Sequence, residues 1–205
     1  MKKVTSNKAC RKHIVIMALG ITTLAFLILV NIVGAAQSTN VWFHKGSELM
    51  NSGKYNEAIK AYDKVIEINP QDSKAWYNKG IALRGLGKSD KAQKAWDKSK
   101  EIDSKAWYNK GNDLYSLNKF DEAIKAYDKA IEINPQHSYA WYNKGIALGK
   151  LGKLDEAIKA FDKVIEINPQ DSKAWHYKGV ALGELGKSDE AQKAYIRAIE
   201  LNSKA

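Results

Sequence analysis

Residues 138–171 read S-Y-A-W-Y-N-K-G-I-A-L-G-K-L-G-K-L-D-E-A-I-K-A-F-D-K-V-I-E-I-N-P-Q-D, and this stretch decides the fold. Apolar and small residues recur in it at helical spacing, in two separate runs. Gly152 lies between the runs and Pro169 follows the second, so both runs end at residues that break helices. The stretch therefore predicts two antiparallel helices joined by a short turn.

The ends of these two helices follow from their capping residues. Ser138 is the expected N-cap of the first helix, which should stop around Gly152-Lys153. The second helix should run from about Asp155 to Ile167, because Asn168-Pro169 cannot continue it.

Nearly the same phrase recurs through residues 37–205, and a tryptophan opens it each time. The intervals between these tryptophans are 34, 31, 34 and 34 residues, which is the period of a helical-hairpin repeat. The tryptophans are Trp42, Trp76, Trp107, Trp141 and Trp175. The repeats that they define cover residues 39–72, 73–103, 104–137, 138–171 and 172–202.

The unit resembles the tetratricopeptide repeat. That family's pattern of Trp, Gly, Tyr, Ala, Phe and Pro is met here by Trp141, Gly145, Leu148, Ala157, Phe161 and Pro169. The resemblance covers roughly residues 39–202. It implies an all-α fold, a right-handed superhelical α-solenoid of five antiparallel helix hairpins. A single hairpin cannot bury its apolar face alone, so the stacking of neighbours is expected to stabilise the array.

Two departures from the regular repeat carry expectations of their own. A lysine stands directly before the glycine of each first helix, where the family usually has Leu, and its stem can lie on apolar surface. These lysines are Lys45, Lys79, Lys110, Lys144 and Lys178. Between repeats two and three, the N-P-Q-D turn is cut to Asp103-Ser104, which predicts a softer or re-angled joint at that point.

The second helix of the fifth repeat is more polar than most of the others. Ser188 and Gln192 stand there at positions that are apolar in other repeats, and they predict a partial cap. Without a further capping helix, Ile199 and Leu201 are expected to stay partly exposed. Such a surface would favour a homo-oligomer formed through the C-terminal repeat.

The first 36 residues differ sharply from the repeats. Residues 1–13 are a basic segment without an acidic residue, and residues 14–36 carry no charge. A helix of that length reaches about 35 Å, which suits a transmembrane anchor. Gly34-Ala35-Ala36 also resembles a cleavage site, so a signal peptide cleaved near Ala36 is the alternative. In both cases the basic flank keeps the N-terminus cytoplasmic, and the repeats are expected outside the membrane, either anchored to it or secreted.

Half of the net charge of +10 belongs to the basic segment. Residues 37–205 keep 28 Lys and Arg against 23 Asp and Glu, with signs alternating along the helices. This pattern is typical of solvated helix faces and predicts no specific nucleic-acid binding. The only cysteine, Cys10, precedes the apolar segment, so the repeats can form neither a disulfide nor a Cys-based metal site.

The sequence predicts no catalytic residue, metal site or cofactor. His44, His137 and His176 fall in different repeats and lack acidic residues at metal-ligand spacing. The chain also has neither a Gly-rich phosphate loop nor a Ser nucleophile elbow. We therefore expect a protein that is not an enzyme.

The resemblance further implies a concave groove lined by the first helix of each unit. Tyr and Ile bury large areas at little entropic cost, which suits a partner peptide or protein segment. Carried over position by position, the partner-binding residues are expected to be Phe43, Tyr77, Ile81, Arg84, Tyr108, Asn112, Tyr115, Tyr142 and Ile146. Residues that only pack on the neighbouring unit would show the same pattern, so packing is the alternative to binding.

The sequence thus predicts a protein-interaction scaffold outside the cytoplasmic membrane. Phe43 and Tyr77 interrupt the carboxylate clamp of some family members, so binding of a chaperone tail is not predicted. The alternative function is a structural repeat protein that self-associates through its uncapped ends.

Overall fold

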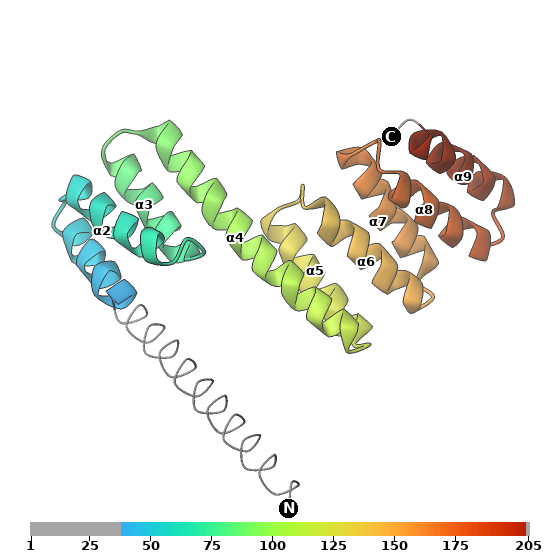
Figure 1. The fold of residues 1–205 in the computed structure, drawn as a ribbon, viewed down its shortest axis with the longest axis horizontal. Helices are drawn as coiled ribbons and strands as arrows, with labels where there is room; N and C mark the ends of the chain where they lie inside the picture. The colour runs from blue at the N-terminus through green and yellow to red at the C-terminus, as the bar shows by residue number, and fades with distance from the viewer. Residues whose placement is uncertain (1–37, 204–205) are drawn as a thin grey trace, which may run out of the picture. The chain divides into compact units, whose positions relative to one another are not determined.

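The computed structural model describes residues 38–203 as helices joined by short turns, without a strand in that range. Consecutive helices run antiparallel within each hairpin (Figure 1). The first described helix covers residues 38–51, and it is followed by α2 (Tyr55–Ile68), α3 (Ser73–Gly85), α4 (Ser89–Ser116), α5 (Phe120–Ile133), α6 (Ser138–Lys150), α7 (Leu154–Ile167), α8 (Ser172–Glu184) and α9 (Ser188–Asn202). The expected all-α fold is confirmed.

The structure divides into two compact units at the boundary between Ala95 and Trp96, which lies inside α4. The N-terminal unit holds residues 38–51, α2, α3 and the start of α4. The C-terminal unit holds the rest of α4 and the helices from α5 to α9. Of the helices in the described part, none combines the length and the apolar character needed to cross a bilayer. The predicted targeting segment, residues 14–36, lies outside the described residues.

A residue with positive φ ends the first helix of the hairpins. After α6, Gly152 has φ +70°, its N–H donates to the Gly149 carbonyl, and the Lys153 N–H donates to the Leu148 carbonyl, each at 3.0 Å. These bonds satisfy carbonyls that have no partner within the helix. Gly53, Gly87 and Gly186 take the same conformation in other hairpins, and Asn118 takes it in the third.

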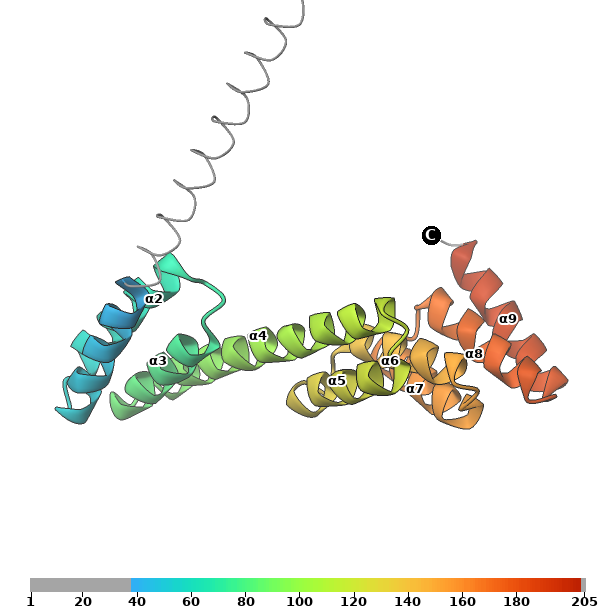
Figure 2. The same cartoon turned by 90° about the horizontal axis from the view of Figure 1, so that it is seen from below.

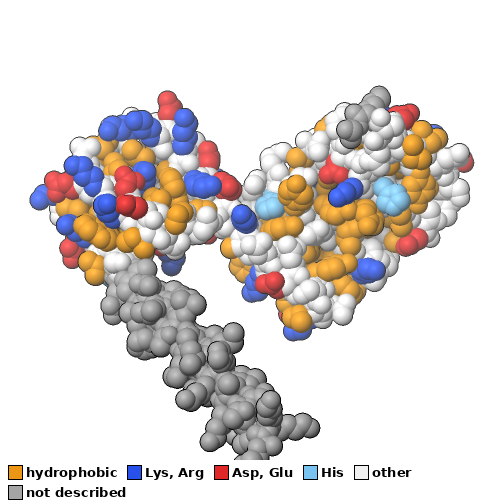
Figure 3. All heavy atoms as spheres, viewed as in Figure 1, with side chains coloured by type: hydrophobic (Ala, Val, Ile, Leu, Met, Phe, Trp, Pro, Cys, Tyr) orange, Lys and Arg blue, Asp and Glu red, His pale blue; other side chains and the backbone are white. Residues whose placement is uncertain are grey.

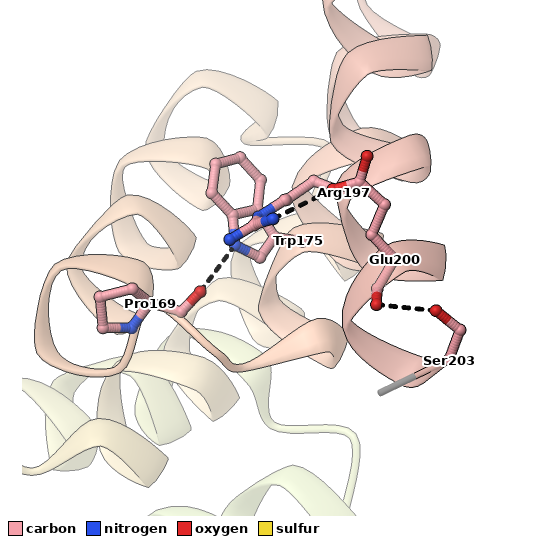
Figure 4. A network of polar contacts seen from close by, with 5 residues as sticks. All are labelled: Pro169, Trp175, Arg197, Glu200 and Ser203. Carbon is pink, nitrogen blue, oxygen red and sulfur yellow. Dashed lines mark hydrogen bonds and ion pairs between the residues drawn. The ribbon is translucent and has the colours of Figure 1, made fainter. Parts of the chain in front are cut away.

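The N-P-Q-D turn between repeats is held by side-chain hydrogen bonds. Between α7 and α8, the side-chain Oδ1 of Asn168 accepts a hydrogen bond from the Gln170 N–H at 3.2 Å. The carboxylate Oδ1 of Asp171 accepts one from the Ala174 N–H at 3.0 Å. The indole Nε1 of Trp175 donates to the Pro169 carbonyl at 3.2 Å (Figure 4). This turn therefore specifies where α7 ends and where α8 begins.

The N-cap of the first helix lies one residue earlier than expected. In α6 the cap is His137, whose Nδ1 accepts from the Ala140 N–H at 3.4 Å, so the assignment of Ser138 is wrong. Asp72 and Asp171 hold the equivalent position before α3 and α8. An N-cap side chain accepts a hydrogen bond from the backbone N–H two or three residues later. In these repeats, the residue directly before the serine makes this bond.

α4 (Ser89–Ser116) is one unbroken helix of 28 residues where the sequence indicated a turn between repeats (Figures 1 and 2). The expected break at Asp103-Ser104 is therefore wrong. The phrase E-I-D-S-K-A lacks the proline that would remove a backbone donor and end the helix. Ser104 is fully buried inside α4, and its hydroxyl donates to the Ala130 carbonyl of α5 at 2.8 Å. The softer joint expected here stays a prediction.

The exposure of the two apolar residues at the end of α9 agrees with the expectation for one of them only. Ile199 is 67% exposed as expected, whereas Leu201 is only 7% exposed. Residues two apart lie on nearly opposite sides of a helix, so both could not face the open end. Ile196, three residues before Ile199, shares its side and is 50% exposed. Ser188 is exposed, as expected for a partial cap.

Candidate functional site

The expected binding residues fall in both units, and those of the N-terminal unit differ in exposure. Phe43 packs edge-on against Tyr62, with 5.7 Å between ring centroids, and belongs to the core of the first hairpin. On α3, Tyr77 is 54% exposed, Ile81 is half-buried and Arg84 is exposed. Phe43 therefore packs within its own hairpin, whereas α3 presents the other three side chains at or near the surface.

In the C-terminal unit, a cleft of about 370 Å³ opens between the first helices of three repeats. Its lining residues are Asn112 and Tyr115 of α4, Tyr127 of α5, Tyr142, Asn143 and Ile146 of α6, and Tyr177 of α8. Four expected binding residues are thus brought together there. On the visible face of this unit, hydrophobic side chains gather with few charged ones among them (Figure 3).

A hydrogen-bond network joins the helices beneath the cleft. The Asn112 Oδ1 accepts from the Tyr127 hydroxyl at 2.9 Å and from the Asn143 Nδ2 at 2.8 Å. The same Nδ2 donates to the Tyr108 hydroxyl at 3.3 Å. The Tyr108 ring packs on those of Tyr127 and His137, with centroids 6.2 and 5.0 Å away. Tyr108, a predicted binding residue, therefore supports the cleft as part of this network.

The aromatic walls of the cleft are held by their neighbours. The ring planes of Tyr142 and Tyr177 meet at 87°, with centroids 5.7 Å apart. Phe161 of α7 lies behind both, stacked on Tyr177 and edge-on to Tyr142, each at 6.0 Å. Tyr115 packs edge-on against Phe120 at 5.2 Å. These contacts support the tyrosine rings from behind.

A second hollow continues the cleft between α6 and α8. Its volume is about 170 Å³, and Ile146 and Tyr177 line both spaces. Val180 and the charged residues Lys150 and Glu184 belong to the second hollow alone. A ligand chain that enters at α4 can therefore continue along the face of α8.

The hydroxyl groups of Tyr127 and Tyr142 are neutral donors. Burial, with a smaller effect of the neighbouring Tyr108, raises the pKa of Tyr127 far above its ordinary value. Burial also raises the pKa of Tyr142, helped by Tyr177 and Asp171. Both groups keep their protons throughout the physiological pH range.

Three lining residues were not among the predicted ones, namely Tyr127, Asn143 and Tyr177. Tyr177 had a signal in the sequence, because Asn78, Asn109 and Asn143 stand at its position in the three preceding repeats. Tyr127 lies on a second helix and reaches the cleft only because Gly111 leaves room: a Cβ there would stand 2.4 Å from its ring. Within residues 38–203, no group of three or more His, Cys, Asp or Glu side chains could hold a metal ion.

Comparisons with known proteins agree on the repeat. Family models described as tetratricopeptide repeat match residues 73–105, 108–172 and 160–193, and one described as TPR repeat matches residues 46–87. No curated protein sequence matches the chain.

Several solved structures are similar over most of the chain. A crystal structure of the MamA protein is 27% identical, covers 82% of this chain and 94% of its own, and has a TM-score of 0.50. A second crystal structure of MamA is 28% identical, with 78% and 95% covered and a TM-score of 0.49. YrrB, described as a TPR protein with an unusual peptide-binding site, is 23% identical, with 78% and 84% covered and a TM-score of 0.47.

Proposed function

Because this chain belongs to the tetratricopeptide repeat family, we propose that it is a protein-interaction scaffold that binds an extended segment of a partner protein in the C-terminal cleft. One observation carries the proposal: Tyr115, Tyr142 and Tyr177 converge from α4, α6 and α8 on a single uncharged cleft. Helices from three successive repeats thus contribute to one surface.

The contact area and the rigidity of the tyrosine rings favour binding in this cleft. Aromatic side chains supply much of the contact energy in protein interfaces, and they have few rotatable bonds to order. In this cleft, Phe161 and Phe120 already hold the tyrosine rings, so little further entropy is lost when a ligand binds. The scaffold acts by presenting a preformed surface.

The N-terminal unit supplies a second surface to this proposal. Tyr77, Ile81 and Arg84 lie along one side of α3, at intervals of four and three residues. These side chains form a contact surface of the N-terminal unit by itself.

An array of immobilised peptides of varied composition, probed with the full chain in neutral detergent, tests the proposal. Tyr142→Ala should lower the bound signal about tenfold, as expected for loss of one central aromatic anchor. Tyr139→Lys is the matched control, because Tyr139 is 71% exposed and repeats two, three and five carry Lys at its position. Equal signals from the wild type and Tyr142→Ala would refute binding in the cleft.

We also propose that the repeats lie outside the cytoplasmic membrane. The support is the uncharged segment 14–36 and the five basic residues that precede it. Mass spectrometry of the native N-terminus separates an anchored chain from one secreted after cleavage near Ala36. Repeats that resist added protease in cells with an intact cytoplasmic membrane would contradict this location.

A second candidate function, self-association through the C-terminal repeat, has its own support. Ile196 and Ile199 form an exposed apolar pair on α9. If this face joins two chains, light scattering should show a mass that rises with concentration, and Ile199→Glu should abolish the rise. A constant monomer mass would reject self-association.

A further inference from the structure

The lining of the C-terminal cleft narrows the chemistry of the ligand. Of its seven described lining residues, four are Tyr, two are Asn and one is Ile, so none carries a charge. A charged ligand side chain buried against these seven residues would lose its hydration without an ion-pair partner among them, which is unfavourable. The matching ligand segment is therefore uncharged.

The hydrogen-bonding groups of the cleft are better suited to a ligand without backbone N–H groups. The Asn112 Oδ1 already accepts two hydrogen bonds, from Tyr127 and Asn143, which uses both of its lone pairs. The Tyr127 hydroxyl donates its only proton to this Oδ1, whereas Tyr142 and Tyr177, whose hydroxyls share one hydrogen bond, leave one O–H donor for a ligand. A chain rich in proline presents carbonyl acceptors and few donors, so it needs only what the hydroxyls supply.

The shape of the aromatic walls also favours a proline-rich ligand. Tyr142 and Tyr177 meet at 87° and form a corner with two flat apolar sides. Proline rings are compact and apolar, and grooves lined by aromatic rings are a recurring way to bind them. A polyproline II segment is also preformed, so it loses little conformational entropy on binding.

We propose that the C-terminal cleft binds an uncharged, proline-rich segment in the polyproline II conformation, laid across α4, α6 and α8. This inference rests on the proposed function and specifies its ligand class. At about 3.1 Å per residue, a segment of about six residues extends about 18 Å along the cleft.

The test measures fluorescence anisotropy of a labelled peptide of about eight prolines, titrated with the full chain in neutral detergent. A Gly-Ser peptide and a polyglutamate peptide of equal length are the comparison probes. The proline peptide should bind at least about tenfold more tightly than either, because only it is both uncharged and preformed. Its affinity should change less than about twofold between low and high salt, since no ion pair forms.

The matched variants come from the repeat itself. Tyr177→Asn installs the residue that three other repeats carry at this position, so the fold should tolerate it, and it removes one wall of the corner. Affinity for the proline peptide should fall about tenfold. Tyr139→Lys also installs a residue of the other repeats, but away from the cleft lining, and should leave the affinity within about twofold. Circular dichroism confirms that both variants keep their helices.

The outcomes separate this inference from the proposed function. If the Gly-Ser or polyglutamate peptide binds as tightly as the proline peptide, the ligand class is overturned, while a Tyr142-dependent signal on the peptide array would still uphold the scaffold. If Tyr177→Asn leaves proline binding intact, the assigned site is overturned. If the array signal is also independent of Tyr142, both proposals fail.

Discussion

Lys144 of α6 reaches back to Asp128 of α5, and 2.6 Å separates its Nζ from the carboxylate Oδ1. The same ammonium group lies 5.3 Å from the centre of the Trp141 ring. Lys79 with Asp63 and Lys178 with Asp162 repeat the ion pair at the same distance. The lysine that replaces the family's usual Leu therefore ties the first helix of a repeat to the second helix of the repeat before it.

Lys144→Ala should destabilise the protein by about 1 kcal/mol, because it removes a partly buried ion pair and the contact with Trp141. Lys144→Leu should lose less stability than Lys144→Ala, because Leu keeps the apolar contact and Asp128 stays half-exposed. The measurement is urea denaturation. Lys163→Ala is the control, because its pair with Glu166 is exposed on both sides. Equal losses from Lys163→Ala and Lys144→Ala would contradict the argument.

Two glycines of α6 should respond in opposite directions to alanine. A Cβ at Gly145 would stand 2.7 Å from the Phe161 ring, so Gly145→Ala should destabilise by about 1–3 kcal/mol. At Gly149 a Cβ meets nothing within 4 Å, so Gly149→Ala should stabilise the helix by about 0.5–1 kcal/mol. The measurement is the urea denaturation midpoint of each variant compared with that of the wild type. A higher midpoint for Gly145→Ala would show that the Phe161 ring can move aside.

His137 should make the fourth repeat sensitive to acid. Its Nδ1 caps α6 as an acceptor, which requires the neutral ring, and burial lowers the pKa of the ring below its ordinary value of 6.5. The unfolded chain therefore binds a proton more readily. The contribution of the cap is complete above pH 6.5 and is lost as pH falls through the lowered pKa.

His137→Asp should reduce this loss, because Asp72 and Asp171 perform the same capping in other repeats. Urea midpoints of both proteins at neutral and mildly acidic pH provide the comparison. If the urea midpoints of the two proteins fall equally between neutral and mildly acidic pH, His137 is not the source of the acid sensitivity.

Restoring the missing turn should divide α4. Insertion of Asn-Pro-Gln between Ile102 and Asp103 recreates the phrase E-I-N-P-Q-D-S-K-A of the first repeat boundary. Proline removes a backbone donor, so amide exchange just after the insertion should accelerate at least about tenfold. Insertion of Ala-Ala-Ala at the same point should leave the helix continuous, and equal exchange in the two variants would contradict the role of the turn.

The softer joint can be tested in the unmodified chain by the same hydrogen-exchange experiment. Amides around Asp103 should exchange faster than those in the middle of α7 (Leu154–Ile167), because Asp103 lies on α4, the helix that holds the boundary between the two compact units at Ala95 and Trp96. Uniform protection across Asp103 would count against a softer joint.

Much of the fold could be predicted because its signals are local. Gly152, Pro169 and the tryptophan spacing mark the hairpins, and the observed ends of α6 and α7 lie within about two residues of the predicted ones. The N-cap was misplaced because His137 and Ser138 are adjacent and only the backbone geometry shows which side chain reaches the Ala140 N–H.

The cleft was predictable only in part. Asn112, Tyr115, Tyr142 and Ile146 repeat at fixed positions on first helices, so the family pattern located them. Tyr127 was not located, because a second-helix residue reaches the cleft only through the space left by Gly111.

The sequence by itself determined the hairpins, because glycine and proline act on the backbone within a few residues of their own position. The absence of a proline allows α4 to continue through Ser104, and tertiary structure adds burial and a hydrogen bond to α5 at that residue. Tertiary structure alone decided that Tyr142 and Tyr177, 35 residues apart, form one corner with Phe161 behind them. Such contacts depend on how neighbouring hairpins stack, and stacking joins residues that no local signal connects.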